Sequence, residues 1–109
     1  ADVICPMAYP SHYWTKKLRH DPYGTMLWTS TEADRRTKKA EIVMWIQAFK
    51  MRHPPGMSMA IYIQRQIQAV HDAKVSGFLL WNARQDYDIA LKAVKDFYDA
   101  QKDGEKHGI

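Results

Sequence analysis

IVMWIQAF, at residues 42–49, is a stretch of nearly continuous apolar character in the middle of a 109-residue chain. An apolar run of this length, without regular polar alternation, is typical of a strand that is buried on both faces. Such strands occur mostly in parallel sheets, where helices connect one strand to the next. The stretch therefore predicts a parallel sheet, with strands and helices alternating on either side of it.

Two further strands are expected around this central one. The first is predicted at residues 3–9, where Pro10 ends an apolar run. The other is predicted at residues 78–83, FLLWNA, directly after Gly77.

Three helices are expected between and after the strands, and residues 10–24 are expected to be loop because they hold several breaker residues. The helices are predicted at residues 31–40, capped by Thr29 or Ser30; at residues 58–73, capped by Ser58; and from a cap at Asp86 or Asp88 onward. The pattern predicts an α/β fold of three consecutive βα units with parallel strands. A doubly wound sheet and part of a barrel share this pattern.

The composition fits one small globular domain. Hydrophobic residues make up 46% of the chain and charged residues 26%, which argues against disorder. We expect one folded segment over residues 1–101 and a charged, frayed tail over residues 102–109. The single cysteine, Cys5, lies within the first apolar run and is expected to be a buried thiol.

Several classes of partner and cofactor are not expected. The net charge of +4 comes from scattered Lys and Arg residues, so there is no basic arm for nucleic acid. No apolar run approaches the roughly 18 residues of a membrane span. The turns that follow the strands are not rich in glycine, which argues against a nucleotide cofactor. The five histidines lack the spacing of a metal site, so neither a cofactor nor a metal is predicted.

Side chains suited to carbohydrate follow the predicted strands at their carboxyl ends, where parallel α/β folds carry their sites. Alternation along the strands places Tyr9, Gln47 and Trp81 on one shared face. Pyranose rings stack on indole and phenol rings, and sugar hydroxyls pair with amides. His12 and Asn82 lie just beyond the strands and complete the candidate sugar site.

Structural alternatives exist for these residues. Trp81 could fill a layer of the core, and His12 could tie its loop to neighbouring segments. Glycoside hydrolysis needs two carboxyl groups about 5 to 9.5 Å apart, and no suitably placed pair follows the predicted strands. We therefore expect this chain by itself to lack the catalytic acid and base.

Three stretches of the sequence resemble a known family: ICPMAYPSHY at 4–13, MWIQAF at 44–49 and QIQAVHDAKVSGFLLWNARQDY at 66–87. Their order and spacing are similar to the C-terminal part of the bacterial family called "putative glycosyl hydrolase domain". The resemblance implies a (β/α)8, or TIM, barrel in which the three predicted strands are strands six, seven and eight.

A more distant similarity connects the chain to chitinase-like glycoside hydrolases. In those barrels the positions that match Tyr9 and Trp81 line the sugar site. Pro10 stands where those enzymes usually carry an Asp, so a carboxylate role at this position is not carried over.

A three-stranded part of a barrel cannot close on itself, because eight strands are the usual number. Its two edges would be unpaired, and its inner face would be apolar and uncovered. The side chains expected on that face are Met7, Val43, Trp45, Leu79 and Trp81. We therefore expect a partner, either the remaining N-terminal barrel segment or a second copy that associates through the inner sheet face.

Two functions follow from the sequence. The first is the carbohydrate-binding wall of a glycoside hydrolase barrel that binds or acts on an oligo- or polysaccharide, with the catalytic acid supplied by absent N-terminal strands. The alternative is a noncatalytic α/β interaction or assembly module. A response of tryptophan fluorescence to oligosaccharides favours the first, and a concentration-dependent oligomer without that response favours the second.

Overall fold

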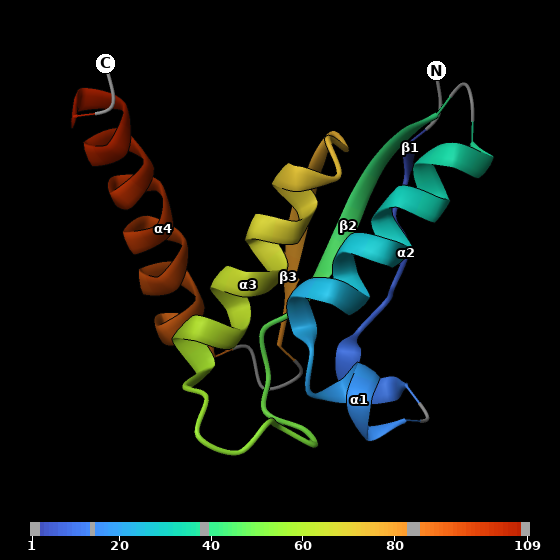
Figure 1. The fold of residues 1–109 in the computed structure, drawn as a ribbon, viewed down its shortest axis with the longest axis horizontal. Helices are drawn as coiled ribbons and strands as arrows, with labels where there is room; N and C mark the ends of the chain where they lie inside the picture. Colours follow the sequence, from blue (N-terminus) through green and yellow to red (C-terminus); the bar gives the residue numbers. More distant parts are fainter. Residues whose placement is uncertain (1–2, 14, 38–39, 83–85, 108–109) are drawn as a thin grey trace.

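The fold is an α/β arrangement with a parallel sheet, as the sequence predicts. A computed structural model describes residues 3–13, 15–37, 40–82 and 86–107, with side chains described as far as residue 101. Within these residues, strands and helices alternate, and three parallel strands lie in the order β1-β2-β3 (Figure 1). The strands are β1 (Val3–Ile4), β2 (Glu41–Gln47) and β3 (Gly77–Trp81).

The first strand is shorter than the sequence predicts. Its ladder is confined to Val3–Ile4 and is followed by an isolated bridge between Met7 and Trp45, whereas the prediction ran over residues 3–9. Pro6 has no N–H to donate, which interrupts regular pairing, although its carbonyl oxygen accepts the Trp45 N–H at 3.1 Å. The chain therefore follows β2 with only intermittent hydrogen bonds. The other two strands lie close to their predicted ranges, and residue 83 lies outside the described residues.

The register between β2 and β3 aligns their side chains in rows across the sheet. Trp45 pairs with Leu79, and Gln47 pairs with Trp81. The bridge from Met7 to Trp45 extends the first of these rows to the β1 side. Gln47 and Trp81 are therefore neighbours at the carboxyl edge of the sheet.

The second helix, α2 (Pro22–Arg36), begins well before the predicted start at residue 31. Asp21 is its N-cap, and the Asp21 carboxylate accepts the Gly24 N–H at 2.9 Å. Pro22 occupies the first turn, where a helix needs no N–H from it. Asp21, Pro22 and Gly24, interpreted as breakers, are thus a helix start, and the prediction of loop over residues 10–24 is wrong for residues 22–24.

Two short helical segments lie within the rest of that predicted loop. A 3-10 turn, η1 (Pro10–His12), follows β1 directly, and α1 (Lys16–Arg19) comes next. The side chain of Thr15 caps α1 by accepting the Leu18 N–H at 3.3 Å. Local capping therefore orders much of the connection between β1 and α2.

The last two helices begin near their predicted positions. Ser58 caps α3 (Met59–Asp72), and its hydroxyl accepts the Ile61 N–H at 3.2 Å. Helix α4 (Asp88–His107) is helical through residue 107 and so includes most of the range 102–109 that the sequence assigned to a tail. Residues 108–109 lie outside the described residues.

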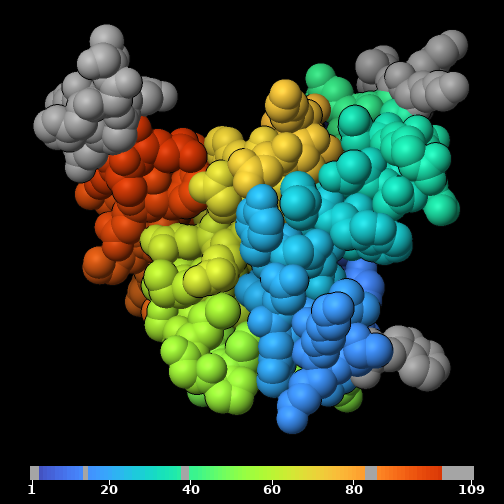
Figure 2. Space-filling model, in the orientation of Figure 1, coloured from blue at the N-terminus to red at the C-terminus, as the bar shows by residue number. Residues whose placement is uncertain are grey.

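One face of the sheet packs against the helices and forms the core. Ile42, Met44 and Ile46 alternate along β2 and are buried in a cluster with residues of the helices. Helices α2 and α3 cross this face, and α4 lies beside α3 (Figure 1). Figure 2 shows the three helices as a continuous outer layer on this side of the molecule. Of the described helices, none is long and apolar enough to cross a membrane.

Several side chains on the other face of the sheet are poorly covered by the described residues, whereas Val43 and Trp45 are half-buried and Gln47 is buried. Met7, Leu79 and Trp81 expose 69%, 39% and 42% of their surfaces. Cys5 is exposed too, so the prediction of a buried thiol is wrong. The physical reason is its place in the edge segment that follows β1, where no second layer lies over it in the described part of the chain.

Candidate functional site

The segments that follow the three strands meet at one end of the molecule, which is the lower end in Figure 1. They are joined by hydrogen bonds from one segment to the next. The Ser11 N–H donates to Gln47 Oε1 at 3.1 Å, and Asn82 Nδ2 donates to the Ala48 carbonyl oxygen at 2.9 Å. The carboxyl edge of the sheet is therefore a bonded unit to which each βα connection contributes.

Gln47 is the centre of this hydrogen-bond network, and it is fully buried. Its Oε1 accepts the Ser11 N–H and the Tyr62 hydroxyl, the latter at 3.3 Å, while its Nε2 donates to the Phe49 carbonyl oxygen at 3.0 Å. The Gln66 amide pairs with the backbone of Gln47, at 2.9 Å to its N–H and 3.1 Å to its carbonyl oxygen. The side chain of Gln47 is thus held in place by three different segments.

Tyr62 supports the network as a permanent hydrogen-bond donor. Its side chain is fully buried on α3, and burial raises the pKa of its phenol far above the ordinary value. The phenol therefore keeps its proton and donates it to Gln47 throughout the physiological pH range. The ring of His53 packs 4.8 Å from the Tyr62 ring, which connects the loop after β2 to α3.

An aromatic cluster lies beside the network, where Tyr9 packs against His12 and Phe49. The ring centroids are 5.4 and 5.5 Å apart, and both contacts are edge to face. Tyr9 is only 5% exposed, yet its hydroxyl has no hydrogen-bond partner among the described residues. Burial, together with the nearby Tyr87, raises the pKa of the Tyr9 phenol. A neutral phenol can both donate and accept, and here the hydroxyl is buried without using either capacity among the described residues.

Trp81 and Asn82 form the opposite part of the edge. The Trp81 ring lies 6.2 Å from the Trp45 ring in an edge-to-face contact and stays 42% exposed. Asn82 Nδ2 donates to the carbonyl oxygens of both Ala48 and Asp86 at 2.9 Å. Asn82 therefore fixes the connection after β3 against the end of β2, next to an exposed indole.

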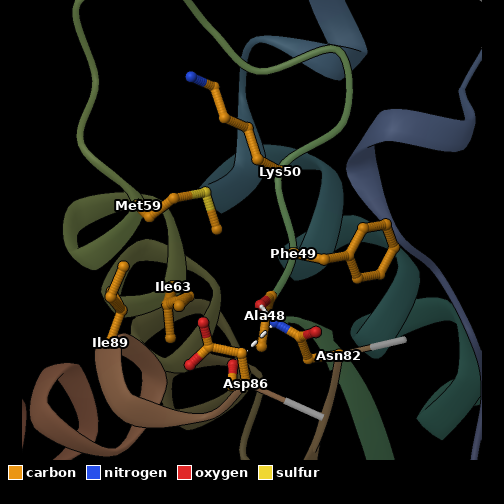
Figure 3. A pocket seen from close by; sticks show the side chains of 8 residues that line it. All are labelled: Ala48, Phe49, Lys50, Met59, Ile63, Asn82, Asp86 and Ile89. Carbon is orange, nitrogen blue, oxygen red and sulfur yellow. Dashed lines mark hydrogen bonds between the residues drawn. The ribbon is translucent and has the colours of Figure 1, made fainter. Parts of the chain in front are cut away.

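A hollow of about 560 Å³ opens at this edge, between the connections that follow β2 and β3 (Figure 3). Lys50 lies on one side of it and Asp86 on the other, and Asn82 faces it from the end of β3 (Figure 3). The eight lining residues are Ala48, Phe49, Lys50, Met59, Ile63, Asn82, Asp86 and Ile89. The wall is mostly apolar, with a few polar groups at fixed positions, as in small-molecule sites generally.

All five residues of the predicted sugar site lie at this edge. Tyr9, His12 and Gln47 gather on the β1 side, and Trp81 and Asn82 lie on the β3 side. Their contact with a ligand remains a prediction, and the amide of Gln47 is engaged by the protein itself.

Sequence reasoning missed the residues that hold this edge together. They are Ser11, Phe49, Tyr62 and Gln66, and Lys50 of the hollow was missed as well. A signal for Gln66 was available, since a polar amide on the apolar stripe of a helix usually has a buried partner. Among the described residues, no three His, Cys, Asp or Glu side chains lie together as a metal ion would require.

Comparison with known proteins identifies a family. The family described as "Putative glycosyl hydrolase domain" matches residues 1–87, which include all three strands and the whole carboxyl edge. Searches of the curated proteins and of the solved structures found no match. The match covers most of the chain, and the chain therefore belongs to the putative glycosyl hydrolase domain family.

Proposed function

We propose that this chain forms the carbohydrate-binding wall of a glycoside hydrolase barrel, with the catalytic carboxyl groups supplied by other strands of that barrel. The observation that carries the proposal is the convergence of ring and amide side chains at the carboxyl ends of three neighbouring parallel strands, beside a hollow of about 560 Å³. Membership of the family is consistent with this chemistry.

The arrangement of the helices is compatible with a barrel. The strands are neighbours in chain order, and α2 and α3 cross the same face. Right-handed crossovers place consecutive helices on one face both in a barrel and within each half of a doubly wound sheet, so the choice of a barrel rests on the resemblance of the sequence and not on this arrangement. The side chains of Met7, Leu79 and Trp81, which are exposed here, would then point into the barrel.

The proposed roles follow from the chemistry of each side chain. Trp81 offers an exposed indole on which the apolar face of a pyranose ring can stack. His12 lies exposed beside Tyr9, whereas the Tyr9 hydroxyl is buried and unpartnered, so Tyr9 reaches a sugar only if the side chains over it move aside. Gln47 holds these groups in position rather than contacting the sugar, because its amide is occupied by Ser11, Tyr62 and Phe49.

Catalytic carboxyl groups are the part that other strands must supply. Asp86 is the one carboxyl among the described residues that lines the hollow. The carboxylate of Asp21, in the connection after β1, is used to cap α2. One carboxyl is insufficient for either mechanism of glycoside hydrolysis, since both require a pair.

An assembly module is the second candidate, and the uncovered sheet face favours it. Apolar side chains exposed to this extent on one face usually mark a contact with another protein surface. On this alternative, Trp81 and Leu79 are interface residues and bind no sugar.

Tryptophan fluorescence tests the proposal. The chain is titrated with a panel of soluble oligosaccharides of four to six units, with α and β linkages, and Trp81→Ala is compared with Trp28→Ala. Trp28 is the matched control because it is 63% exposed on α2, a helix that covers the other face of the sheet.

We expect quenching by at least one oligosaccharide, lost in Trp81→Ala and kept in Trp28→Ala. Circular dichroism verifies that each variant is folded. A folded wild-type chain that responds to no oligosaccharide would overturn the proposal, and a concentration-dependent dimer in that case would support the assembly module.

A further inference from the structure

The net positive charge of the chain lies at the carboxyl edge of the sheet. The connections at residues 10–21 and 48–58 contain five basic residues and one acidic residue, whereas the rest of the chain contains eleven of each. Both connections follow strands at the same end of the molecule (Figure 1). The +4 net charge of an otherwise balanced chain therefore equals the net charge of these two connections, the first of which includes the short helix α1. The basic residues are Lys16, Lys17, Arg19, Lys50 and Arg52.

Most of these side chains differ from the paired lysines of α4. Lys92 pairs with Asp96 at 3.1 Å, and Lys95 pairs with Asp99 at 2.9 Å, both on α4. At the carboxyl edge, by contrast, four basic side chains are exposed and form no ion pair among the described residues: Lys16, Lys17, Lys50 and Arg52.

We propose that the carbohydrate bound at this edge is anionic, and that Lys50 is the residue that recognises its charged group. The inference rests on the proposed function and specifies the class of its ligand. Lys50 is an exposed residue that lines the hollow directly after the aromatic Phe49, and its ammonium group lies at the outer end of the side chain (Figure 3). An anionic substituent placed at Lys50 leaves one sugar ring over the apolar wall of the hollow. Trp81 does not line the hollow, so the ring that stacks on Trp81 is a different unit of the same oligosaccharide.

Asp86 gives the ligand an orientation. Its carboxylate lines the same hollow on the side away from Lys50 (Figure 3). A carboxylate accepts hydrogen bonds from sugar hydroxyls and repels a second anion. A saccharide with one charged end and one hydroxyl-bearing end therefore fits, whereas a strand with a phosphate at every unit brings negative charge towards Asp86.

The charged group can be a carboxylate, as in a uronic acid, or a sulfate ester. An ammonium group is a point charge that binds either kind of anion, so Lys50 does not discriminate between them. Separate uronate and sulfated oligosaccharides in the experiment distinguish these two sources.

The experiment measures binding to charged oligosaccharides and to their neutral counterparts by titration calorimetry at low and moderate salt. The probes are oligosaccharides of several linkages that carry one uronate or one sulfate ester at an end, and each is compared with its methyl ester or its desulfated form. A single-stranded oligonucleotide of equal length is included. Lys50→Met is compared with Lys92→Met, which removes the same charge from a paired lysine on α4.

We expect at least one charged oligosaccharide to bind about tenfold more tightly than its neutral counterpart, with the difference shrinking as salt is added. Lys50→Met should weaken that binding by roughly threefold to fivefold, as for one solvent-exposed ion pair. Lys92→Met should leave it unchanged. Preference for the sulfated over the uronate probes, or the reverse, identifies the anion.

Four results would overturn the inference. Equal binding of a charged oligosaccharide and its neutral counterpart refutes the inference. If Trp81→Ala then weakens the binding of both equally, the proposed function still stands. If Lys50→Met and Lys92→Met lose the same amount of binding affinity, the effect comes from the net charge of the chain and not from Lys50 itself. Binding of the oligonucleotide as tightly as the best saccharide removes the carbohydrate specificity, and absence of all binding rejects both proposals.

Discussion

Replacing Gln47 with alanine should destabilise the fold far more than an ordinary loss of one amide. The substitution leaves the Ser11 N–H and the Tyr62 hydroxyl without their acceptor, and both residues are fully buried. Each buried donor that is left unpaired costs about 1–3 kcal/mol. We therefore expect a loss of about 4 kcal/mol in the free energy of unfolding, a large share of the roughly 5–15 kcal/mol typical of small domains.

Urea unfolding followed by circular dichroism measures this loss at 25 °C. Gln68→Ala is the matched control, because Gln68 on α3 makes one exposed hydrogen bond, to Asp72 of the same helix at 2.8 Å. We expect that control to lie within about 0.5 kcal/mol of the wild type. The slope of free energy against urea should stay constant, since the surface exposed on unfolding is nearly the same.

The reasoning about Gln47 would be refuted by a loss below about 1 kcal/mol, or by equal losses in Gln47→Ala and Gln68→Ala. Either result would mean that Ser11 and Tyr62 find other partners and that the network does not fix the carboxyl edge. Hydrogen exchange of the Ser11 amide adds a local readout, because its protection should fall in Gln47→Ala more than global stability accounts for.

Two further predictions concern hydroxyl groups. Tyr62→Phe removes one donor to Gln47 but leaves the Ser11 N–H as the other, so urea unfolding should detect a loss of only about 1 kcal/mol. The Tyr23 hydroxyl donates to Asp72 at 2.5 Å, and this bond lowers the pKa of Asp72 below its ordinary value of 3.8. Its stabilising effect should be present above the unfolded pKa and lost as pH falls through the lowered folded pKa. An NMR titration of the Asp72 carboxyl should give a midpoint that moves back up in Tyr23→Phe, and an unchanged midpoint would contradict the assignment.

The central strand and α3 could be predicted from sequence because a single signal determined each of them. The apolar run at residues 42–49 left little choice but a buried strand, and the apolar stripe after Ser58 matched a helical period. The start of α2 could not be predicted in the same way. Asp21 and Pro22 are typical of turns and of helix starts alike, and only the capping bond to Gly24 distinguishes the two.

The location of the candidate site could be predicted from sequence, but not which of its residues are buried in the protein's own network and which stay exposed. Strand ends in a parallel sheet meet at one edge, so five suitable residues could be placed together from sequence. Burial depends on tertiary neighbours, and alternation alone put Gln47 on an open face. The side chains of Tyr62 and Gln66 on α3 enclose it instead. The exposure of Cys5 has a similar cause, since nothing in an apolar run reports whether a second layer covers it.

Mapping of amide chemical shifts during an oligosaccharide titration tests the central claim most directly. The account predicts that the shifts concentrate at the carboxyl edge, in residues 9–12, 47–50 and 81–82 and at residues 86–87, which line the hollow or adjoin it. Residues at the opposite end of the sheet, such as Ser76 and Gly77, should stay unchanged. Shifts confined to that opposite end, or to the outer faces of α2 and α4, would contradict it.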